Sequence, residues 1–354
     1  MSISVEFFGK NKEGKDVSIY TITNSKGSSI KVTDMGAVWV AALMPDKDGK
    51  LEDVILGFEN SEEYECRNYV GMGSIIGRNS NRISNHCFTL DGKEYVLENN
   101  DRGNNLHSGN NFYACRLWDA KAVDTELGEG IEFSLFSPHM DQGFPGNLNI
   151  TVTYILTEDN EVIIEYNGVS DMNTVVNMTN HAYFNLAGHK SGTIHDHMIW
   201  IDADYYTRGE NGSVTTGELY PVEGTPMDFR QLKRIGDDLE GDFKPIVDVG
   251  GYDHNFCLKT SFDSTELVAK LVEPNSKRVM DVFTNMPGMQ MYTGNFLWDG
   301  NKGKDGMTYH SFHGVALETQ FYPDAINNPQ FPSPIVKANE PFNYCTIYHF
   351  SVME

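Results

Sequence analysis

The sequence predicts an all-β fold, a large antiparallel β-sandwich with few short helices. Apolar and polar residues alternate with a period of two in many segments, as they do along strands whose two faces differ. Turn-forming Gly, Pro, Asn and Asp residues separate these segments at short intervals. Amphipathic stretches with helical period are scarce and short. Together these observations favour two antiparallel sheets packed face to face.

The expected elements follow the chain in order. A short helix is expected at residues 61–66 and another at 229–235. One hairpin joins 88–90 to 94–97 across the Asp91-Gly92 turn, and a second joins 149–157 to 161–166. Further strands are expected at 278–284, 287–296, 314–321 and 344–350.

The length fits one large all-β domain. The chain has 354 residues, of which 40% are apolar, and this is enough to fill a sizeable core. Its 33 glycines and 17 tyrosines suit a protein rich in turns and strands. No linker, low-complexity stretch or clear repeat divides it. We therefore expect a single domain over residues 1–354.

The charge of the chain limits its partners. A formal net charge of −23 gives a surface that repels nucleic acid and anionic membranes, so neither is expected as a partner. The longest apolar run, at 36–44, is too short to span a bilayer. The N-terminus has neither the basic segment nor the apolar core of a signal peptide, so the default location is cytoplasmic. A monomer or a homodimer would fit these properties.

Several classes of functional site lack their sequence signature. The five cysteines are scattered and form no CxxC pair, so neither a disulfide framework nor a zinc site is indicated. The sequence also lacks HExxH, GxSxG, GxGxxG and P-loop motifs. These absences weaken the zinc hydrolase, serine hydrolase, dinucleotide and nucleotide-phosphate interpretations.

Glu318 is the most informative residue for chemistry. Alternation along the expected strand places Glu318 and Gln320 on the face opposite Leu317 and Phe321. The larger apolar residues would then fill the core. The pattern alone leaves open whether the face of Glu318 is an exposed polar surface or the wall of a binding site.

Other polar residues stand in motifs that have ordinary structural explanations as well. His107 lies in a polar loop and His181 in a Thr-Asn-His-Ala-Tyr-Phe-Asn segment, and each is, by itself, more often a structural histidine. Arg78 and Arg82 belong to a turn-rich segment where surface cations are common. Asp253 fits a local Asx turn equally well. Metal binding is not indicated for either histidine, because no further ligand lies at the usual spacing.

Taken together, the segments resemble the aldose 1-epimerase (galactose mutarotase) family. The matching pieces occur in the order of the family: 77–83, 106–107, 143–148, 179–188, 216–230, 253–256, 287–296 and 317–325. Each piece is weak alone, and the whole set covers roughly residues 70 to 335.

The resemblance implies a galactose mutarotase-like β-sandwich with an open sugar cleft, and it assigns roles to matched residues. Glu318 would be the general base, His181 the general acid, and His107 would assist at the ring or anomeric oxygen. Asn81, Arg82, Asp253 and Gln290 would hold sugar hydroxyls, and Arg78 is a further candidate. The implied substrates are free hexoses such as galactose and glucose, with a place in hexose metabolism. No metal or cofactor is required.

The chain departs from the family pattern in three loops. Ser108 follows His107 where the family usually has Gly, Tyr113-Ala114-Cys115 replaces a segment that often carries a charged pair, and His86-Cys87 stands where a small residue is more usual. These departures bear on substrate preference, not on the acid–base pair.

The chemistry of anomer exchange explains why such residues suffice. A base removes the proton from the C1 hydroxyl while an acid protonates the ring oxygen, and each positioned group contributes about 10²–10⁴-fold. The reaction as written needs an ionised Glu318 and a protonated His181, and we expect Asp253 to favour the imidazolium.

Three other functions remain open from the sequence. An inverting glycosidase would use Glu318 and Asp253 as its two carboxyl groups, and it would leave the histidines without a role. A sugar-phosphate epimerase would need a basic phosphate site, for which no clear Arg or Lys cluster is present beside the motifs. A non-catalytic sugar-binding module would tolerate the loss of either His181 or Glu318, yet both are retained.

Overall fold

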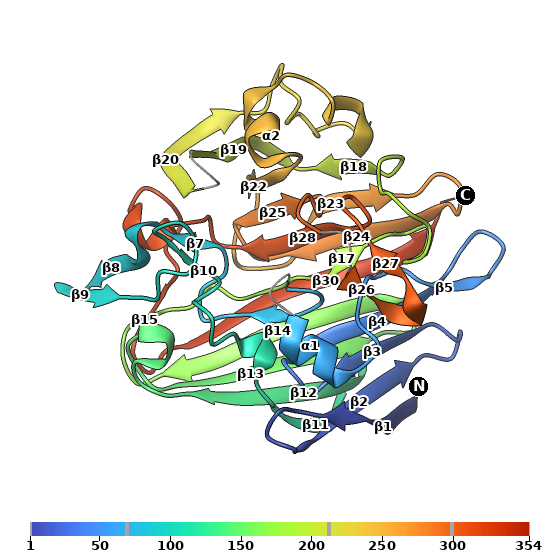
Figure 1. The fold of residues 1–354 in the computed structure, drawn as a ribbon, viewed down its shortest axis with the longest axis horizontal. Coiled ribbons are helices and arrows are strands. Elements are labelled where there is room, and N and C mark those ends of the chain that lie inside the picture. The colour runs from blue at the N-terminus through green and yellow to red at the C-terminus, as the bar shows by residue number, and fades with distance from the viewer. Residues whose placement is uncertain (1, 68–70, 211–213, 298–300, 354) are drawn as a thin grey trace.

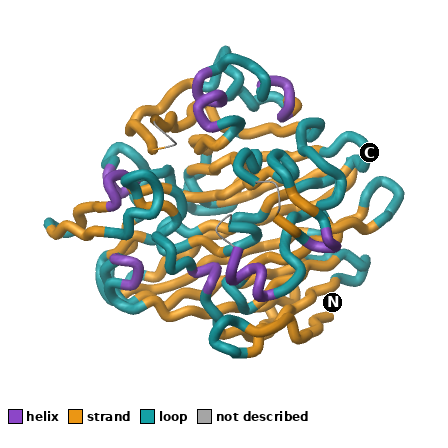
Figure 2. The backbone as a smooth tube through the Cα atoms, in the orientation of Figure 1, coloured by secondary structure: helices purple, strands orange, loops and turns teal. Residues whose placement is uncertain are grey.

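The structure is a computed structural model that describes residues 2–67, 71–210, 214–297 and 301–353. Strands dominate it, and the helical segments are short and peripheral (Figures 1 and 2). Within the described ranges, no helix is long and apolar enough to cross a membrane. The predicted all-β fold is confirmed.

Three large antiparallel sheets contain most of the strands. The five-stranded sheet follows chain order: β1 (Ser2–Lys10), β2 (Asp16–Thr23), β3 (Ser29–Thr33), β4 (Val38–Pro45) and β5 (Leu51–Asp53). The nine-stranded sheet has the order β11 (Asp119–Thr125), β12 (Gly128–Ser137), β13 (Leu148–Leu156), β14 (Glu161–Ser170), β30 (Pro341–Val352), β24 (Arg278–Thr284), β23 (Glu266–Val272), β18 (Met198–Ile201) and β21 (Lys233–Arg234). The six-stranded sheet has the order β17 (Tyr183–Phe184), β28 (Val315–Gln320), β25 (Gly288–Tyr292), β22 (Asp253–Leu258), β19 (Ala203–Glu210) and β20 (Val214–Pro221).

Short two-stranded pairs lie outside the three large sheets. They are β6 (Ile75–Ile76) with β16 (Thr179–Asn180), β7 (Arg82–Ile83) with β10 (Asn105–Leu106), β8 (Cys87–Leu90) with β9 (Lys93–Val96), β15 (Thr174–Val175) with β29 (Ile335–Val336), and β26 (Asn301–Lys302) with β27 (Thr308–Tyr309). In Figure 1, β7 and β10 lie beside the ends of β25 and β28, although they come from a distant part of the chain.

The six-stranded and nine-stranded sheets share one apolar core. Leu317 of β28 and Tyr348 of β30 both belong to it, and the Tyr348 hydroxyl donates to the Leu317 carbonyl at 3.1 Å. Beside them, the Thr319 and Thr346 hydroxyls are 2.5 Å apart. Trp39 of the five-stranded sheet packs against Phe184 and Tyr348. The strand that carries Glu318 is therefore fixed from beneath by the large sheet.

Two buried cations join the five-stranded sheet to the rest of the molecule. The Arg278 guanidinium donates to the carbonyls of Met44, Leu186 and Lys50. The Lys304 ammonium donates to the carbonyls of Val40 and Ile55 at 2.7 and 2.9 Å and pairs with Asp53. Burial lowers the pKa of Lys304, but these acceptors satisfy the three donors of the ammonium group.

Most of the predicted elements are present. Both predicted hairpins are confirmed as β8–β9 and β13–β14, the strand at 278–284 is β24, and the helix at 61–66 is α1 (Ser61–Arg67). The predicted helix at 229–235 is wrong. β21 pairs there with β18, and a single 3-10 turn follows at Ile235–Asp238. In this segment, Lys233 and Arg234 pair with Ile199 and Met198 at the edge of the sheet, and this pairing requires an extended backbone.

A helix that the sequence analysis missed is α2 (Lys244–Val249). Pro245 stands in its first turn, and Gly250 ends it in the left-handed conformation with φ 68°. This Pro-to-Gly spacing is the usual signature of a helix start and stop, and it was available in the sequence.

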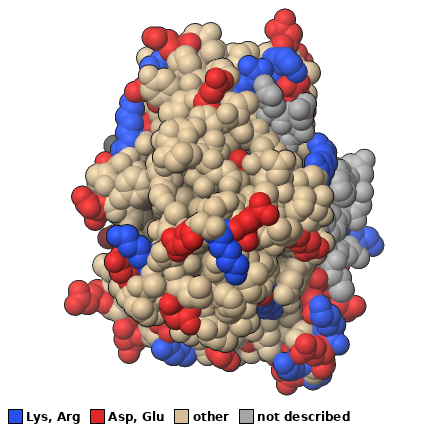
Figure 3. All heavy atoms as spheres, turned by 90° about the vertical axis from the view of Figure 1, so that its left-hand side faces the viewer, with Lys and Arg blue, Asp and Glu red and all other residues tan. Residues whose placement is uncertain are grey.

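Charged groups are dispersed over the face seen in Figure 3. Acidic and basic side chains are interspersed around a largely uncharged centre, and the basic ones do not form a continuous patch on this face. On this face the negative charges are therefore dispersed.

The burial of His197 predicts that the stability of the protein depends on pH. Its Nε2 accepts the backbone N–H of Leu186 at 2.9 Å, and burial lowers the pKa of His197 to about 4. Between pH 6.5 and 4 the unfolded chain binds a proton that the folded protein does not. The free energy of unfolding is therefore unaffected by His197 above about pH 6.5. It decreases as the pH falls toward 4, and the total loss due to His197 is at most about 3 kcal/mol.

We expect urea unfolding to show a loss of stability from pH 7 to 4.5, and we expect this loss to be smaller in His197→Gln. Glutamine can still accept the Leu186 N–H but does not titrate. An equal or larger pH dependence in the variant would contradict this interpretation of His197.

Candidate active site

Strand register brings the polar residues of three distant segments together on one face of the six-stranded sheet. Gln290 of β25 lies opposite Glu318 of β28 on one side and Asn255 of β22 on the other. In the neighbouring row, Asp253 of β22 lies opposite Tyr292 of β25. Directly opposite residues in a sheet share a face, so these side chains gather above one surface.

The other face of the same strands is the core. Leu317 and Met291 are opposite one another in register and are fully buried in the shared apolar cluster. The alternation read from the sequence is therefore correct, but both faces of β28 are covered. Glu318 is only 2% exposed, which excludes an exposed polar surface for it.

A cavity of about 320 Å³ lies above this polar face. Its walls carry the residues Gly71, Ile76, Asn81, Arg82, Asp101, Arg102, Leu106, His107, Phe112, His181, Tyr183, Asp253, Tyr292, Phe296 and Glu318. Six of the eight residues proposed from the sequence line it. Gln290 and Arg78 do not.

His181 reaches the cavity from the turn between β16 and β17. Its backbone N–H donates to Ser74 and its carbonyl accepts from Gly73. Gly71 lies against the imidazole, where a Cβ atom would come within 2.9 Å of the ring. The ring is thereby held with its Nε2 3.5 Å from Oε1 of Glu318, and both side chains are buried.

His107 is held by the β7–β10 pair. Its backbone N–H donates to the Asn81 carbonyl, and its Nδ1 accepts the backbone N–H of Asn81 at 3.1 Å. An accepting Nδ1 means that the neutral ring carries its hydrogen on Nε2. The His107 and His181 rings lie with centroids 5.8 Å apart.

These three side chains are close enough to raise the question of a metal. One ligand atom each from His107, His181 and Glu318 lies within 4.8 Å of the others. The tautomer of His107 argues against this use, because a ring that accepts at Nδ1 offers an N–H donor at Nε2 rather than a lone pair. The arrangement suits donation to an oxygen atom better than metal coordination.

Burial changes the protonation of the pair in opposite directions. Removal from water raises the pKa of Glu318 well above its usual range, and the nearby Asp253 adds to the rise. Removal from water lowers the pKa of His181 to about 4, although Asp253 acts to raise it. Asp253 thus acts on His181 in the expected direction, but burial outweighs its charge, and the pKa of His181 lies below its ordinary value.

The remaining predicted residues divide into those that reach the cavity and those behind it. Arg82 lines the cavity, and its Nε donates to Asp101 at 2.7 Å. Asn81 also lines it, and its side-chain oxygen accepts the backbone N–H of Arg82. Gln290 lies behind Asp253, to whose carboxylate its Nε2 donates at 2.6 Å.

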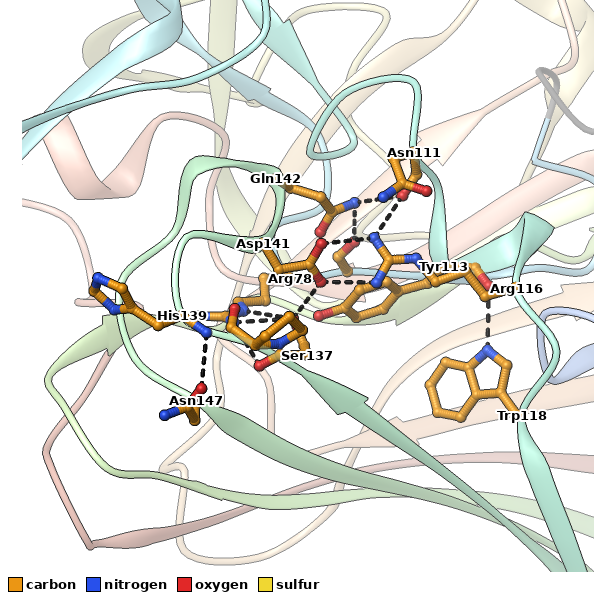
Figure 4. A network of polar contacts seen from close by, with 12 residues as sticks. Arg78, Asn111, Tyr113, Arg116, Trp118, Ser137, His139, Asp141, Gln142 and Asn147 are labelled. Carbon is orange, nitrogen blue, oxygen red and sulfur yellow. Dashed lines mark hydrogen bonds and ion pairs between the residues drawn. The ribbon is translucent and has the colours of Figure 1, made fainter.

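Arg78 does not reach the cavity. Its guanidinium is fully buried and donates to Ser137, Thr174 and the carbonyls of Pro138, Pro145 and Gly146. Figure 4 shows this network, in which Arg116 and Ser137 also contact Asp141. The expectation that Arg78 holds a sugar hydroxyl does not fit this position, since its donors are already used to fix the loop after β12.

Comparison with known proteins agrees with this geometry. A sequence profile described as aldose 1-epimerase matches residues 18–349. The chain belongs to the aldose 1-epimerase family. It is accordingly an enzyme of the isomerase class that acts on carbohydrates.

Relatives of the family match over nearly the whole chain. The galactose mutarotase of Sus scrofa is 38% identical over 99% of both chains, and that of Homo sapiens is 40% identical over 91% of both. The aldose 1-epimerase of Escherichia coli K12 is 35% identical over 96% of both. Among solved structures, the galactose 1-epimerase of Lactobacillus acidophilus NCFM has a TM-score of 0.86 at 26% identity, covering 100% of this chain and 99% of that one.

Several cavity residues of this aldose 1-epimerase family member were missed by sequence reasoning. Tyr183 and Tyr292 lie inside matched motifs, so alternation from Glu318 and Gln290 could have found them. Asp101, Arg102 and Phe112 stand in loops outside any matched segment, and no local pattern indicated them. Phe296 packs against Tyr292 and is 45% exposed at the wall of the cavity.

Ser108 explains how the chain tolerates its departure from the glycine usual in the family. It adopts a left-handed backbone conformation with φ 69°, which favours glycine. Its hydroxyl accepts the backbone N–H of Asn79 at 2.8 Å and donates to the Asn79 carbonyl at 3.0 Å. These two hydrogen bonds offset the cost of the conformation and hold the loop beside His107.

We expect Ser108→Ala to destabilise the protein by about 1–3 kcal/mol, because it keeps the unfavourable backbone and loses both hydrogen bonds. Ser108→Gly loses the same bonds but relieves the backbone, so its loss is expected to be smaller. Urea unfolding of the two variants measures the difference. An alanine variant as stable as the glycine variant would contradict this explanation.

Proposed function

We propose that the protein is a mutarotase that interconverts the α and β anomers of free hexoses such as D-galactose and D-glucose. The observation that carries the proposal is the pairing of Glu318 and His181, buried side by side at the wall of one cavity with Nε2 and Oε1 3.5 Å apart. His107 adds a third group that can contact the reacting oxygens. The family membership of the chain supports the same reaction.

In the proposed reaction, Glu318 takes the proton from the C1 hydroxyl and His181 gives a proton to the ring oxygen. The C1–O5 bond breaks, and an open-chain aldehyde forms. Rotation about C1–C2 presents the other face, and the reverse transfers close the ring. His107 donates through Nε2–H to an oxygen that gains charge.

The pKa changes of the pair are compatible with these roles. A neutral Glu318 with a neutral His181 contains the same number of protons as a carboxylate with an imidazolium. The catalytic form therefore arises when one proton moves within the site, and the solvent neither supplies nor receives one. The low exposure of both groups keeps bulk water away from the proton that moves.

Substrate binding is proposed to use the polar residues around the pair. Arg82, fixed by Asp101, and Asp253, fixed by Gln290, would hold hydroxyls away from the reacting carbon. Holding that end leaves C1 free to rotate. Phe296, partly exposed at the wall, offers an apolar surface against which a sugar ring can stack.

Polarimetry on freshly dissolved α-D-galactose and α-D-glucose tests the proposal. We expect the protein to speed relaxation to an unchanged final rotation. Glu318→Gln is expected to lower kcat/KM by about 10²–10⁴-fold, because one proton-transfer group is lost. Glu273→Gln is the matched control. It makes the same change at a buried carboxylate, in the turn after β23 where Glu273 accepts from Asn275 and Ser276, and activity should be retained.

Other outcomes of the same assay identify the alternatives. No acceleration with any free aldose would overturn the mutarotase proposal. Acceleration with hexose 6-phosphates alone would favour a sugar-phosphate enzyme, and release of reducing sugar from an aryl glycoside would favour a glycosidase. Normal turnover by a folded Glu318→Gln variant would remove Glu318 as the base.

The pH profile provides a second test. If the active pair of Glu318 and His181 shares one proton, the plot of kcat/KM against pH is bell-shaped. Activity falls at low pH because the pair gains a second proton, and it falls at high pH because the pair loses the shared one. The charge of Asp253 raises the pKa of both Glu318 and His181. Asp253→Asn is therefore expected to move both limbs to lower pH. An unchanged bell, or one that moves to higher pH, would contradict the proposed coupling.

A further inference from the structure

A row of buried polar side chains extends from the active site into the interior of the six-stranded sheet. Thr207 of β19 lies opposite Asn255 of β22, Asn255 lies opposite Gln290 of β25, and Gln290 lies opposite Glu318 of β28. All four residues are between 1% and 4% exposed. Such a row is costly in a sheet unless its polar atoms find partners.

Asn255 and Gln290 lack part of those partners. Both the nitrogen and the oxygen of the Asn255 amide have no hydrogen-bond partner among the residues that the structure describes, and the same holds for Oε1 of Gln290. Asn255 is 1% exposed, so bulk water does not reach it. The Gln290 nitrogen is the exception, since it donates to Asp253.

A small cavity separate from the sugar cavity lies beside these atoms. It measures about 20 Å³, and its walls include Thr207, Thr215, Asp253, Asn255 and Gln290. Gly288 helps to leave room for the amide, because a Cβ at that position would come within 2.5 Å of Oδ1 of Asn255. A space of about this size holds one water molecule, whose site needs two to four polar partners.

The atoms without a hydrogen-bond partner suit a water molecule in the small cavity better than a cation. The Asn255 amide presents a donor as well as an acceptor, and exchanging its nitrogen and oxygen does not change that. A metal ion could satisfy the oxygens but would face the N–H group. One water molecule can accept from Asn255 and donate to Oε1 of Gln290.

We propose that Asn255 is a positioning residue, which acts through one buried water molecule on Gln290 and through Gln290 on Asp253. A water that donates to Oε1 fixes the Gln290 amide with its nitrogen toward the Asp253 carboxylate. Without the water, Oε1 has no partner among the described residues, and the amide is held only by its hydrogen bond to the Asp253 carboxylate. The inference rests on the proposed function, because the water would matter by holding Asp253 in the orientation that binds the sugar.

The test compares three variants. Asn255→Leu keeps the approximate volume and removes both amide atoms. Gly288→Ala presses on the Asn255 oxygen from the neighbouring strand, and also on the ring of Tyr322. Asn255→Ser restores a group that both donates and accepts, and it leaves space for water. Galactose affinity is measured by calorimetry, and kcat, KM and the pH profile by polarimetry.

We expect Asn255→Leu and Gly288→Ala to weaken galactose binding and raise KM about tenfold, the effect of one misplaced buried hydrogen-bonding group. Their kcat should stay within about threefold, because Glu318 and His181 are untouched. Asn255→Ser should bind within about threefold of the parent. A loss of kcat at unchanged KM, or no rescue by serine, would show a merely structural role and overturn the proposal.

A crystal structure can show whether the proposed water molecule is present, and this test does not depend on an activity measurement. We expect a crystal structure of the parent protein to show one water within hydrogen-bond distance of Asn255 and Gln290, and that of Asn255→Leu to lack it. An empty cavity, a metal ion there, or a direct Asn255–Gln290 hydrogen bond would overturn the inference. If the parent binds galactose without turning it over, the proposed function fails, while the affinity of the variants still tests Asn255.

Discussion

The burial of the Glu318 carboxyl group is the constraint on which the active site depends. An ionised carboxylate at 2% exposure costs several kcal/mol, so the group is driven toward its neutral form and its pKa rises. The adjacent imidazole is driven the other way for the same reason. Two groups that would differ by about two pKa units in water thus exchange their usual order of proton affinity. The packed site therefore favours the neutral pair over a carboxylate with an imidazolium.

That burial is possible because β28 is rigid and covered on both sides. Beneath it, Leu317 packs in the common core and its carbonyl accepts from Tyr348 of the large sheet. Above it, the β6–β16 and β7–β10 pairs bring His181 and His107 over the sheet from distant parts of the chain. Two pairs of very short strands therefore place both histidines at the wall of the cavity.

Local patterns in the sequence were sufficient for strands whose neighbours lie close in the chain. The hairpins β8–β9 and β13–β14 depend on turns and alternation, and both were predicted correctly. Alternation also placed Glu318 opposite Leu317. The predictions that failed concern segments in which contacts with residues distant in the chain override the local sequence preference. Within residues 229–235, a short strand joins a sheet edge where a helix was expected. Arg78 lies in a motif that also contains cavity residues, but its guanidinium donates its hydrogen bonds to a loop instead.

The sequence by itself determined which residue types are present for acid–base chemistry, which face of β28 they occupy, and to which family the pattern is similar. The tertiary structure alone decided that Glu318, His181 and His107 line one cavity, that Gln290 stands behind Asp253, and that Asp101 fixes Arg82. It also decided that the pKa of Glu318 rises, because the fold removes this carboxyl group from water. The physical reason is that register between distant strands and removal from water are properties of the packed chain, and no short segment contains either of them.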